Sequence, residues 1–235
     1  AVRGKLVPQD PNDEPASELL KRIARERARL EAEGTFTKNK ATPVVGEDEW
    51  PFRAPTGWNW IRLAALGEFK GGKTPSTNRS EYWSGPIPWV SPKDMKSLVV
   101  KETEDHVSEL ALSDGLASIP ANSVLIVVRS GILRRMVPVA INERMCAINQ
   151  DLKALCLVQP ALARYVQLII QGFERLILAT LTKVGTTVES IKFDEFSRQP
   201  FPLPPLAEQH RIVAKVDGLM ALCDRLEAEQ ADAGA

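Results

Sequence analysis

The sequence contains few of the residues from which metal centres and catalytic triads are built. It has three cysteines and two histidines in 235 residues, and Cys146, Cys156 and Cys223 lack the spacing of metal ligands. His106 lies in the acidic stretch KETEDHVSE and His210 lies in a predicted helix, so both are expected at the surface. The sequence therefore argues against a metal site. Its cysteines are few and odd in number, which fits a protein of the reducing cytoplasm.

Long apolar runs and an excess of one charge are also absent. The longest candidate for a membrane helix, Val166–Leu181, is interrupted by Glu174 and Arg175, and a membrane span needs roughly 20 apolar residues, so no membrane association is expected. Basic and acidic residues number 30 each, but residues 50–200 carry 18 basic and 14 acidic residues. The net positive charge of this middle part permits binding to an anionic partner such as nucleic acid.

Complete catalytic motifs are missing, with one apparent exception. No G-x-S-x-G, H-E-x-x-H or D/N-P-P-[YF] sequence occurs, but GEFKGGKT at Gly67–Thr74 has the G-x-x-x-x-G-K-[ST] spacing of a phosphate-binding P-loop. A P-loop needs a helix that starts at the Lys-Thr pair. Pro75 follows Thr74 directly and disfavours helical geometry there. We therefore predict an exposed loop, and a P-loop NTPase is the least favoured alternative.

Composition and periodicity divide the chain into three parts, with the boundaries 1–49, 50–200 and 201–235. In the middle part, short apolar runs bounded by turn residues predict three strands, at 123–128, 137–141 and 153–158. A longer apolar pattern predicts one helix over about 161–181. The middle part is therefore expected to be an α+β domain with a β-sheet core, in which Trp83 and Trp89 pack.

The two outer parts each predict a long helix. In the first part, apolar residues at three- and four-residue steps predict a helix over about 15–33, ended by Gly34. In the third part, Pro204–Pro205 precedes a predicted helix that continues to about residue 230. Ile212, Val216, Leu219, Cys223 and Leu226 follow one another there at the 4, 3, 4, 3 spacing of a heptad seam.

Two interpretations of these helices are open. Each can be an amphipathic helix that covers the core of its own domain, which periodicity alone supports at least equally. The favoured interpretation is an antiparallel coiled coil that flanks the domain. In that pair, residues of the first helix pack against residues of the last: Leu19, Ile23 and Leu30 against Ile212, Val216, Leu219 and Leu226.

At both ends the sequence resembles one known family. PFPLPPLAEQHRIVAKVDGLMALCDRLEA closely resembles the distal conserved helix of type I restriction–modification specificity subunits, and GKLVPQDPNDEPASELLKRI resembles their central conserved region. Between them, GGKTPS, EYWSGPIPWVSPKDM, IPANSVLIVVRSGILRR, AINQDLKAL and KVGTTVESI are similar, in order, to the family's target recognition domain. The resemblance covers nearly the whole chain, but with one recognition domain only. We therefore expect the C-terminal half of a longer subunit, or a half-subunit.

The resemblance implies a non-catalytic role. In this family each recognition domain reads one half of a split double-stranded DNA target, while the conserved helices act as a spacer and dock methyltransferase subunits, through which restriction subunits are joined. No cofactor is expected in this chain, because S-adenosylmethionine and ATP with magnesium belong to the partner subunits. A chain with a single recognition domain is expected to form a homodimer through its helices.

Three polar segments are candidates for DNA contact. The first contains Arg129, Ser130, Arg134 and Arg135, and arginine can bind guanine O6 and N7 with two hydrogen bonds. The second is the 67–79 loop, with Lys70, Lys73, Thr74, Ser76, Asn78 and Arg79. The third contains Lys183, Thr186 and Thr187. We predict that Arg134 or Arg135 reads a base while Lys70 and Lys73 hold phosphates.

Each candidate segment also has an ordinary structural interpretation. The first can be a solvated hairpin tip and the third a helix-to-strand turn. Asn149–Gln150 can read adenine but is assigned a structural role at the start of a strand. If none of these segments reads bases, the chain is a helical scaffold for assembly, which is the main alternative function.

Overall fold

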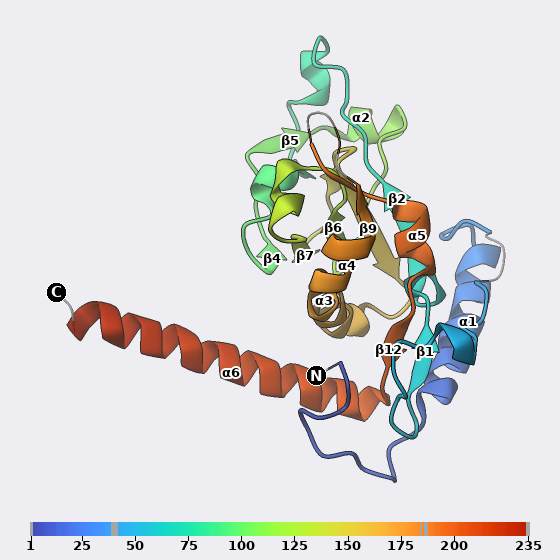
Figure 1. Cartoon of the computed structure of the whole chain (residues 1–235). Coiled ribbons are helices and arrows are strands. Elements are labelled where there is room, and N and C mark those ends of the chain that lie inside the picture. Colours follow the sequence, from blue (N-terminus) through green and yellow to red (C-terminus); the bar gives the residue numbers. More distant parts are fainter. Residues whose placement is uncertain (1, 39–41, 184, 186–187, 234–235) are drawn as a thin grey trace.

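A five-stranded sheet and a three-stranded sheet organise the structure, a computed structural model that describes residues 2–38, 42–183, 185 and 188–233 (Figure 1). The α-helices are α1 (Ala16–Ala32), α2 (Glu109–Ser113), α3 (Ala163–Gly172), α4 (Glu174–Thr180), α5 (Phe193–Arg198) and α6 (Leu206–Ala233). The strands are β1 (Asn59–Ile61), β2 (Gly67–Gly71), β3 (Ile87–Val90), β4 (Val99–Val100), β5 (Asp105–Val107), β6 (Val124–Val127), β7 (Val139–Asn142), β8 (Ala147–Ile148), β9 (Leu152–Leu157), β10 (Thr182–Lys183), β11 (Ser190–Ile191) and β12 (Phe201–Leu203). This mixture of helix and sheet confirms the predicted α+β class.

The five-stranded sheet has the order β2-β9-β6-β7-β4 and is antiparallel except for β4, which runs parallel to β7. Its three central strands, β9, β6 and β7, coincide with the predicted strands at 153–158, 123–128 and 137–141. All four residues of β6 are buried, which explains why its sequence is an unbroken apolar run. The strand prediction is therefore confirmed in the part of the sheet that forms the main core.

One helix predicted over 161–181 is divided into α3 and α4. The helical backbone is interrupted at Phe173, where φ is −100° and ψ is 4°. The Phe173 ring packs 5.1 Å from that of Phe201 in β12, and Glu174 accepts a 2.8 Å hydrogen bond from the Val137 amide. The prediction of a single helix was wrong at this junction, because contacts with distant segments fix the backbone there.

The three-stranded sheet has the order β5-β3-β8 and carries a small core of its own. Trp89 of β3 is buried in this core, and the half-buried Trp83 packs against it with ring centroids 5.1 Å apart. The prediction that both tryptophans pack in the core is confirmed. This sheet lies beside the start of β9, since Asn149 donates from its amide to Val90 at 2.9 Å.

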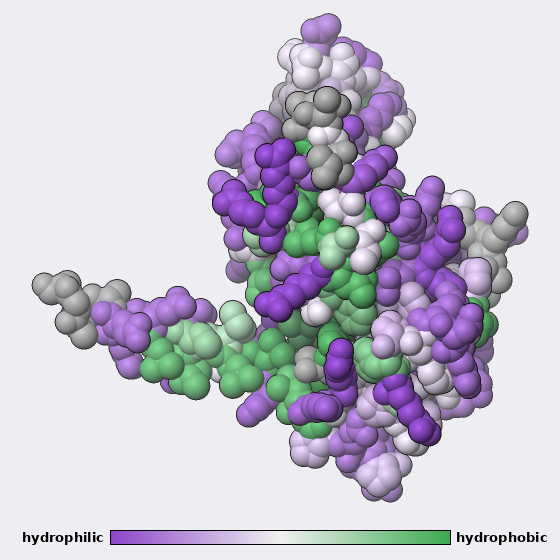
Figure 2. All heavy atoms as spheres, in the orientation of Figure 1, coloured by the Kyte–Doolittle hydropathy of each residue, from purple (hydrophilic) through white to green (hydrophobic). Residues whose placement is uncertain are grey.

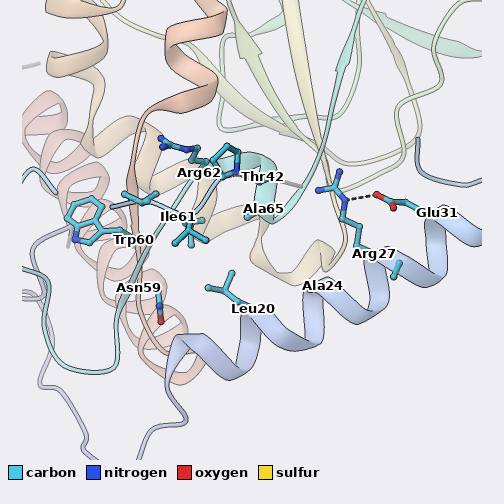
Figure 3. A pocket seen from close by; sticks show the side chains of 14 residues that line it. Leu20, Ala24, Arg27, Glu31, Thr42, Asn59, Trp60, Ile61, Arg62 and Ala65 are labelled. Carbon is cyan, nitrogen blue, oxygen red and sulfur yellow. Dashed lines mark hydrogen bonds and ion pairs between the residues drawn. The ribbon is translucent and has the colours of Figure 1, made fainter. Parts of the chain in front are cut away.

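Helix α1 confirms the helix predicted over about 15–33, and its apolar side packs on the domain. Leu19 and Ile23 are fully buried, and Leu30 is partly buried against the same core. Figure 3 shows α1 beside β1 and the 3₁₀ turn η2 (Leu63–Ala65). Leu20 and Ala24 of α1 line a cavity of about 550 Å³ between the helix and these two elements. The first of the two open interpretations, an amphipathic helix on its own domain, therefore holds for α1.

Helix α6 projects away from the domain and from α1 (Figure 1). Ile212 is buried at its base, but the side chains of Leu219 and Leu226 are 42% and 50% exposed. Because Leu19 and Ile23 are already buried in the domain core, they are not available to these leucines. The predicted antiparallel pairing of α1 with α6 within one chain was therefore wrong.

The exposed part of α6 keeps an apolar stripe. Leu219, Met220, Leu222 and Leu226 are all exposed, and Figure 2 shows apolar side chains following one side of the helix outward from the domain. Val216, closer to the domain, packs partly against the main core. Among the helices of the described residues, none has the length and apolarity that crossing a membrane requires.

Candidate nucleic-acid interface

The P-loop-like sequence forms an edge strand and a loop. Gly67 to Gly71 make up β2, which pairs with β9, and a Cβ at Gly67 would lie 2.1 Å from the Cys156 carbonyl oxygen. Gly72 approaches the backbone of Asn149 just as closely, since a Cβ at Gly72 would lie 2.0 Å from the Asn149 carbonyl oxygen. The next element of the described chain after Thr74 is a 3₁₀ turn at Ser80–Tyr82. The glycines therefore allow close backbone packing, and the Walker spacing is coincidental.

Four hydrogen bonds fix the loop that follows β2. The Lys73 amide donates to Ile148 at 3.0 Å, and its carbonyl accepts from Trp89 Nε1 at 3.1 Å. Trp83 Nε1 donates to the Ser76 carbonyl at 3.2 Å, and Thr74 Oγ1 donates to Gln150 Oε1 at 2.5 Å. These bonds leave the side chains of Lys73, Ser76 and Asn78 exposed. Lys70 was predicted in this loop, but it lies within β2 and is half-buried.

Arg79 is held by neighbouring side chains. Its Nε pairs with Glu81 at 2.7 Å, its Nη1 pairs with Asp114 at 3.1 Å, and its guanidinium lies 4.0 Å from the centre of the Tyr82 ring. The hydrogen bond that Tyr82 donates to Asp114 raises the pKa of the tyrosine and lowers that of the carboxyl. Arg79 thus joins the loop to the C-terminal end of α2, and its contact with DNA stays a prediction.

The segment of Arg129 to Arg135 forms a 3₁₀ turn, η5 (Gly131–Arg134), in place of the hairpin tip that was the alternative. Ser130 caps this turn by accepting a hydrogen bond from the Ile132 amide at 3.4 Å. Leu133 is buried and anchors the turn to the core. The side chains of Arg129, Arg134 and Arg135 are all exposed, as direct contact with DNA requires.

Two of these arginines pair with carboxylates that sequence reasoning missed. Arg129 Nε lies 2.5 Å from Asp151 Oδ1, and Arg134 Nε lies 2.6 Å from Glu189 Oε1. The hydrogen bond from Arg134 lowers the pKa of Glu189, although burial opposes this shift. For Arg135 no ion pair is found among the described residues. These partners lie 22 and 55 residues away along the chain, so no local sequence signal indicates them.

The third candidate segment adjoins the first. Lys183 is exposed at the end of β10 and pairs in register with Ser190 of β11, while Thr186 and Thr187 lie outside the described residues. Arg129 forms an antiparallel bridge with Ser190. The Ser130 amide donates to the Glu189 carbonyl at 3.1 Å. The β10–β11 hairpin and η5 are therefore neighbours.

The turn at Asn149–Asp151 joins the first and second segments, and the third reaches it only through the first. The Asp151 carbonyl accepts the amides of Val128 and Arg129 at 2.8 and 3.2 Å, and Gln150 accepts from Thr74. Asn149 is buried, which supports the structural role predicted for it. Figure 1 places these segments in the half of the domain farthest from α6, and Figure 2 shows hydrophilic side chains around them. Residues predicted separately as DNA contacts thus share one region.

The composition of this region suits an anionic partner. In the residues that the structure describes, no group of three or more histidine, cysteine, aspartate or glutamate side chains is arranged to hold a metal ion. The region presents exposed cationic side chains, two of which pair with carboxylates, on backbone that is fixed by hydrogen bonds. Such a surface suits contact with an anionic polymer, because phosphate contacts need cations and base contacts need fixed geometry.

Comparison with known proteins identifies the family. Residues 55–233 match the model of the type I restriction modification DNA specificity domain. The chain is 39% identical over 160 residues to the EcoR124I/EcoR124II specificity subunit of Escherichia coli, covering 67% of this chain and 40% of the relative. It is 33% identical over 243 residues to the Escherichia coli EcoAI specificity subunit, covering 97% of this chain and 39% of the relative.

Solved structures show the same fold. The crystal structure of the HsdS subunit from Thermoanaerobacter tengcongensis aligns with a TM-score of 0.58 at 21% identity, over 91% of this chain and 50% of that one. A chain from a structure of a type I R-M system aligns with a TM-score of 0.62 at 20% identity, over 93% and 52%. The present chain spans about two fifths of the length of these curated relatives. It belongs to the family of type I restriction modification DNA specificity domains.

Proposed function

We propose that this chain is a sequence-specific DNA-recognition module of a type I restriction–modification complex, and that it reads one half of a split double-stranded target. The observation that carries the proposal is that the Asn149–Asp151 turn holds the segments of Arg129 and Thr74 together, while the hairpin that carries Lys183 adjoins the segment of Arg129. Membership of the specificity domain family supports it independently. The match to about two fifths of each curated relative fits one recognition domain of a two-domain subunit.

Different side chains of this region have different roles. Arg129, Arg134 and Arg135 are the base readers, because arginine can bind guanine with two hydrogen bonds. Lys73 and Lys183 hold phosphates, since they are exposed and lie on backbone that is fixed by hydrogen bonds or strand pairing. Lys70 is a weaker candidate than its sequence position suggested, because β2 holds it half-buried.

The module itself is non-catalytic. Chemistry belongs to methyltransferase and restriction subunits, which supply the sites for S-adenosylmethionine and for ATP with magnesium. The curated relatives are specificity subunits by name, which supports this division of labour. The protein acts in the cytoplasm, where the host DNA and these subunits are found.

The exposed stripe on α6 is the assembly surface. Leu219, Leu222 and Leu226 have the spacing of a helix that packs on another helix. The partner helix belongs to a second recognition half, either in the same subunit or in a second copy of this chain, and methyltransferase subunits dock on the pair. A two-fold dimer of this chain would place two recognition domains on one split target.

Binding across a salt series tests this function against a pure scaffold. The specificity subunit is assembled with its methyltransferase subunits and titrated with duplexes selected from a randomised library. Replacing Lys73 or Lys183 with alanine should weaken binding to all sequences alike. It should also lower the slope of log affinity against log salt concentration by about one. Replacing Arg134 or Arg135 with alanine should cost about 1–3 kcal/mol and relax the preference at one position. If the chain is only a scaffold, the DNA affinity of the wild type and of every variant should be independent of the DNA sequence.

A further inference from the structure

The arginines of this domain differ in which nitrogen atoms their internal partners occupy. Arg129 and Arg134 each use only Nε, which donates to Asp151 and Glu189 respectively. Within the residues that the structure describes, their Nη1 and Nη2 atoms donate no hydrogen bond. Arg144 differs, because it is held by its terminal Nη2. Arg129 and Arg134 therefore keep the outer edge of the guanidinium unoccupied.

That outer edge is the one that recognises guanine end-on. Two parallel N–H donors can bind the O6 and N7 acceptors of guanine in the major groove, and no other base presents two acceptors there. The side chains of Arg129 and Arg134 are 50% and 65% exposed, whereas those of Asp151 and Glu189 are 23% and 6% exposed. Each carboxylate thus lies beneath a guanidinium that faces solvent.

The pair of Arg134 and Glu189 is poorly suited to stabilising the fold. An ion pair with a largely exposed arginine contributes little, while burying a carboxylate is costly. Glu189 Oε2 is buried without a hydrogen-bond partner among the described residues. The backbone of Glu189 is fixed by the hydrogen bond it accepts from Ser130, so its side chain restricts where Arg134 can point.

Asp151 is fixed from a different direction. Its amide donates to Asn149 Oδ1 at 2.9 Å, and its Oδ2 accepts from Asn149 Nδ2 at 3.4 Å. Asn149 is itself bound to Val90 of the three-stranded sheet. The second carboxylate oxygen, Oδ1, accepts from Arg129. A chain of contacts therefore runs from the buried Asn149 through Asp151 to the exposed guanidinium.

We propose that Asp151 and Glu189 are positioning residues that present Arg129 and Arg134 end-on to two guanines of the DNA half-site. The proposal rests on the DNA-recognition function proposed above, and it adds the base that is read and the residues that orient the readers. A fixed guanidinium loses less freedom on binding, so its preference for guanine over other bases is sharper.

The experiment selects duplexes from a library randomised over the target, using the specificity subunit assembled with its methyltransferase subunits. Arg134→Lys keeps the charge but removes the forked donor pair, so the preference for guanine should fall about 10- to 100-fold at one position. Glu189→Gln and Glu189→Ala should lower the preference at the same position, the alanine variant more strongly. Arg129→Lys and Asp151→Asn should each lower the preference for guanine at a second position, the same one for both variants.

Arg144→Lys is the matched control, because its terminal nitrogen is already bound to Glu102; it should leave every preference unchanged. Thermal melting of each variant identifies those that fail to fold. If Glu189→Ala fails to fold, Glu189→Gln, Asp151→Asn and Arg129→Lys still test the proposal. The inference is overturned if lysine at 134 and 129 changes no guanine preference. It is also overturned if the lysine variants lose the preference for guanine while the Asp151 and Glu189 variants keep that preference. A wild-type complex that selects no sequence would overturn the proposed function itself.

Discussion

Glu208, in the first turn of α6, accepts a 2.8 Å hydrogen bond from the indole Nε1 of Trp58, a residue 150 positions earlier in the chain. Glu208 is 1% exposed, and its Oε1 has no partner among the described residues. Arg211, one turn later, pairs with Asp13 in the loop before α1. The base of α6 is therefore attached to two segments that are distant in the sequence.

This arrangement predicts how stability depends on pH. Burial raises the pKa of Glu208 above its usual 4.5, although the bond from Trp58 and the charge of Arg211 lower it and the charge of Asp13 adds to the rise. Because the folded-state pKa is the higher one, folding favours the protonated carboxyl. Its contribution is complete below pH 4.5 and is lost as pH rises through the raised value. Glu208→Gln should therefore increase the free energy of unfolding at pH 8, and the increase should shrink towards pH 4.5.

Trp58→Phe is the matched opposite change. It removes the one hydrogen-bond donor that the described residues supply to the buried carboxylate. It should therefore lower the free energy of unfolding by about 1.5–3 kcal/mol at pH 8 and by less near pH 4.5. Urea denaturation at several pH values measures both variants. An effect of Glu208→Gln that is the same at all pH values would show that the buried charge is not responsible.

The cysteines should differ sharply in reactivity. Burial raises the pKa of Cys146 to about 12 and raises that of Cys156, whereas Cys223 is exposed on α6. Since the thiolate is the reactive form, a colorimetric disulfide reagent at pH 8 should modify one thiol in the native monomer and three after unfolding. Cys223→Ser should abolish the native reaction. Rapid modification of a second thiol in the folded protein would contradict the burial of Cys146 and Cys156.

No nucleotide should bind at the Walker-like sequence. The motif's glycines pack against β9 and the Asn149 carbonyl, and no helix starts at Thr74 in the described chain, so a triphosphate would meet no cradle of amides. Titration with ATP or GTP and magnesium should give no saturable signal, and Lys73→Ala should behave like the wild type. A micromolar affinity that disappears in Lys73→Ala would restore the P-loop interpretation.

The sequence predicted local elements well because they depend on local patterns. The apolar runs Val124–Val127 in β6 and Val139–Ile141 in β7 reflect burial on both faces, and Pro204–Pro205 marks the start of α6. The pairing of α1 with α6 could not be judged in this way. Heptad spacing shows that a helix has an apolar side, but the partner of that side depends on three-dimensional arrangement, and Leu19 belongs to the domain core.

The candidate site was predictable only in part, for a related reason. Exposed arginines beside a Ser-Gly pair were found because turn residues and charge are local signals. Asp151 and Glu189 were missed because their importance comes from contacts with Arg129 and Arg134, which are distant in sequence. The contact of Arg79 with Asp114 was missed for the same reason, since the two residues are 35 positions apart.

The stripe on α6 should control association. Leu219 is 42% exposed and lies on the same side as Val216 and Leu226. Leu219→Asp should leave thermal stability nearly unchanged, because the residue touches solvent in the isolated chain. Burying an aspartate in a helix seam in place of leucine forfeits about 1.5–3 kcal/mol of apolar burial and adds the cost of the charge. The dissociation constant for a second copy, or for methyltransferase subunits, should therefore rise at least tenfold.

Ala221→Asp supplies the control for this effect. Ala221 is exposed on the same helix, and two residues turn an α-helix by about 200°, which places it on the side opposite Leu219. It introduces the same charge outside the apolar stripe, so association should be unchanged. Light scattering after size exclusion, over a range of concentrations, compares the two variants with the wild type. If both variants associate as the wild type does, the stripe is not the assembly surface; if both fail equally, added charge and not the loss of an apolar contact is the cause.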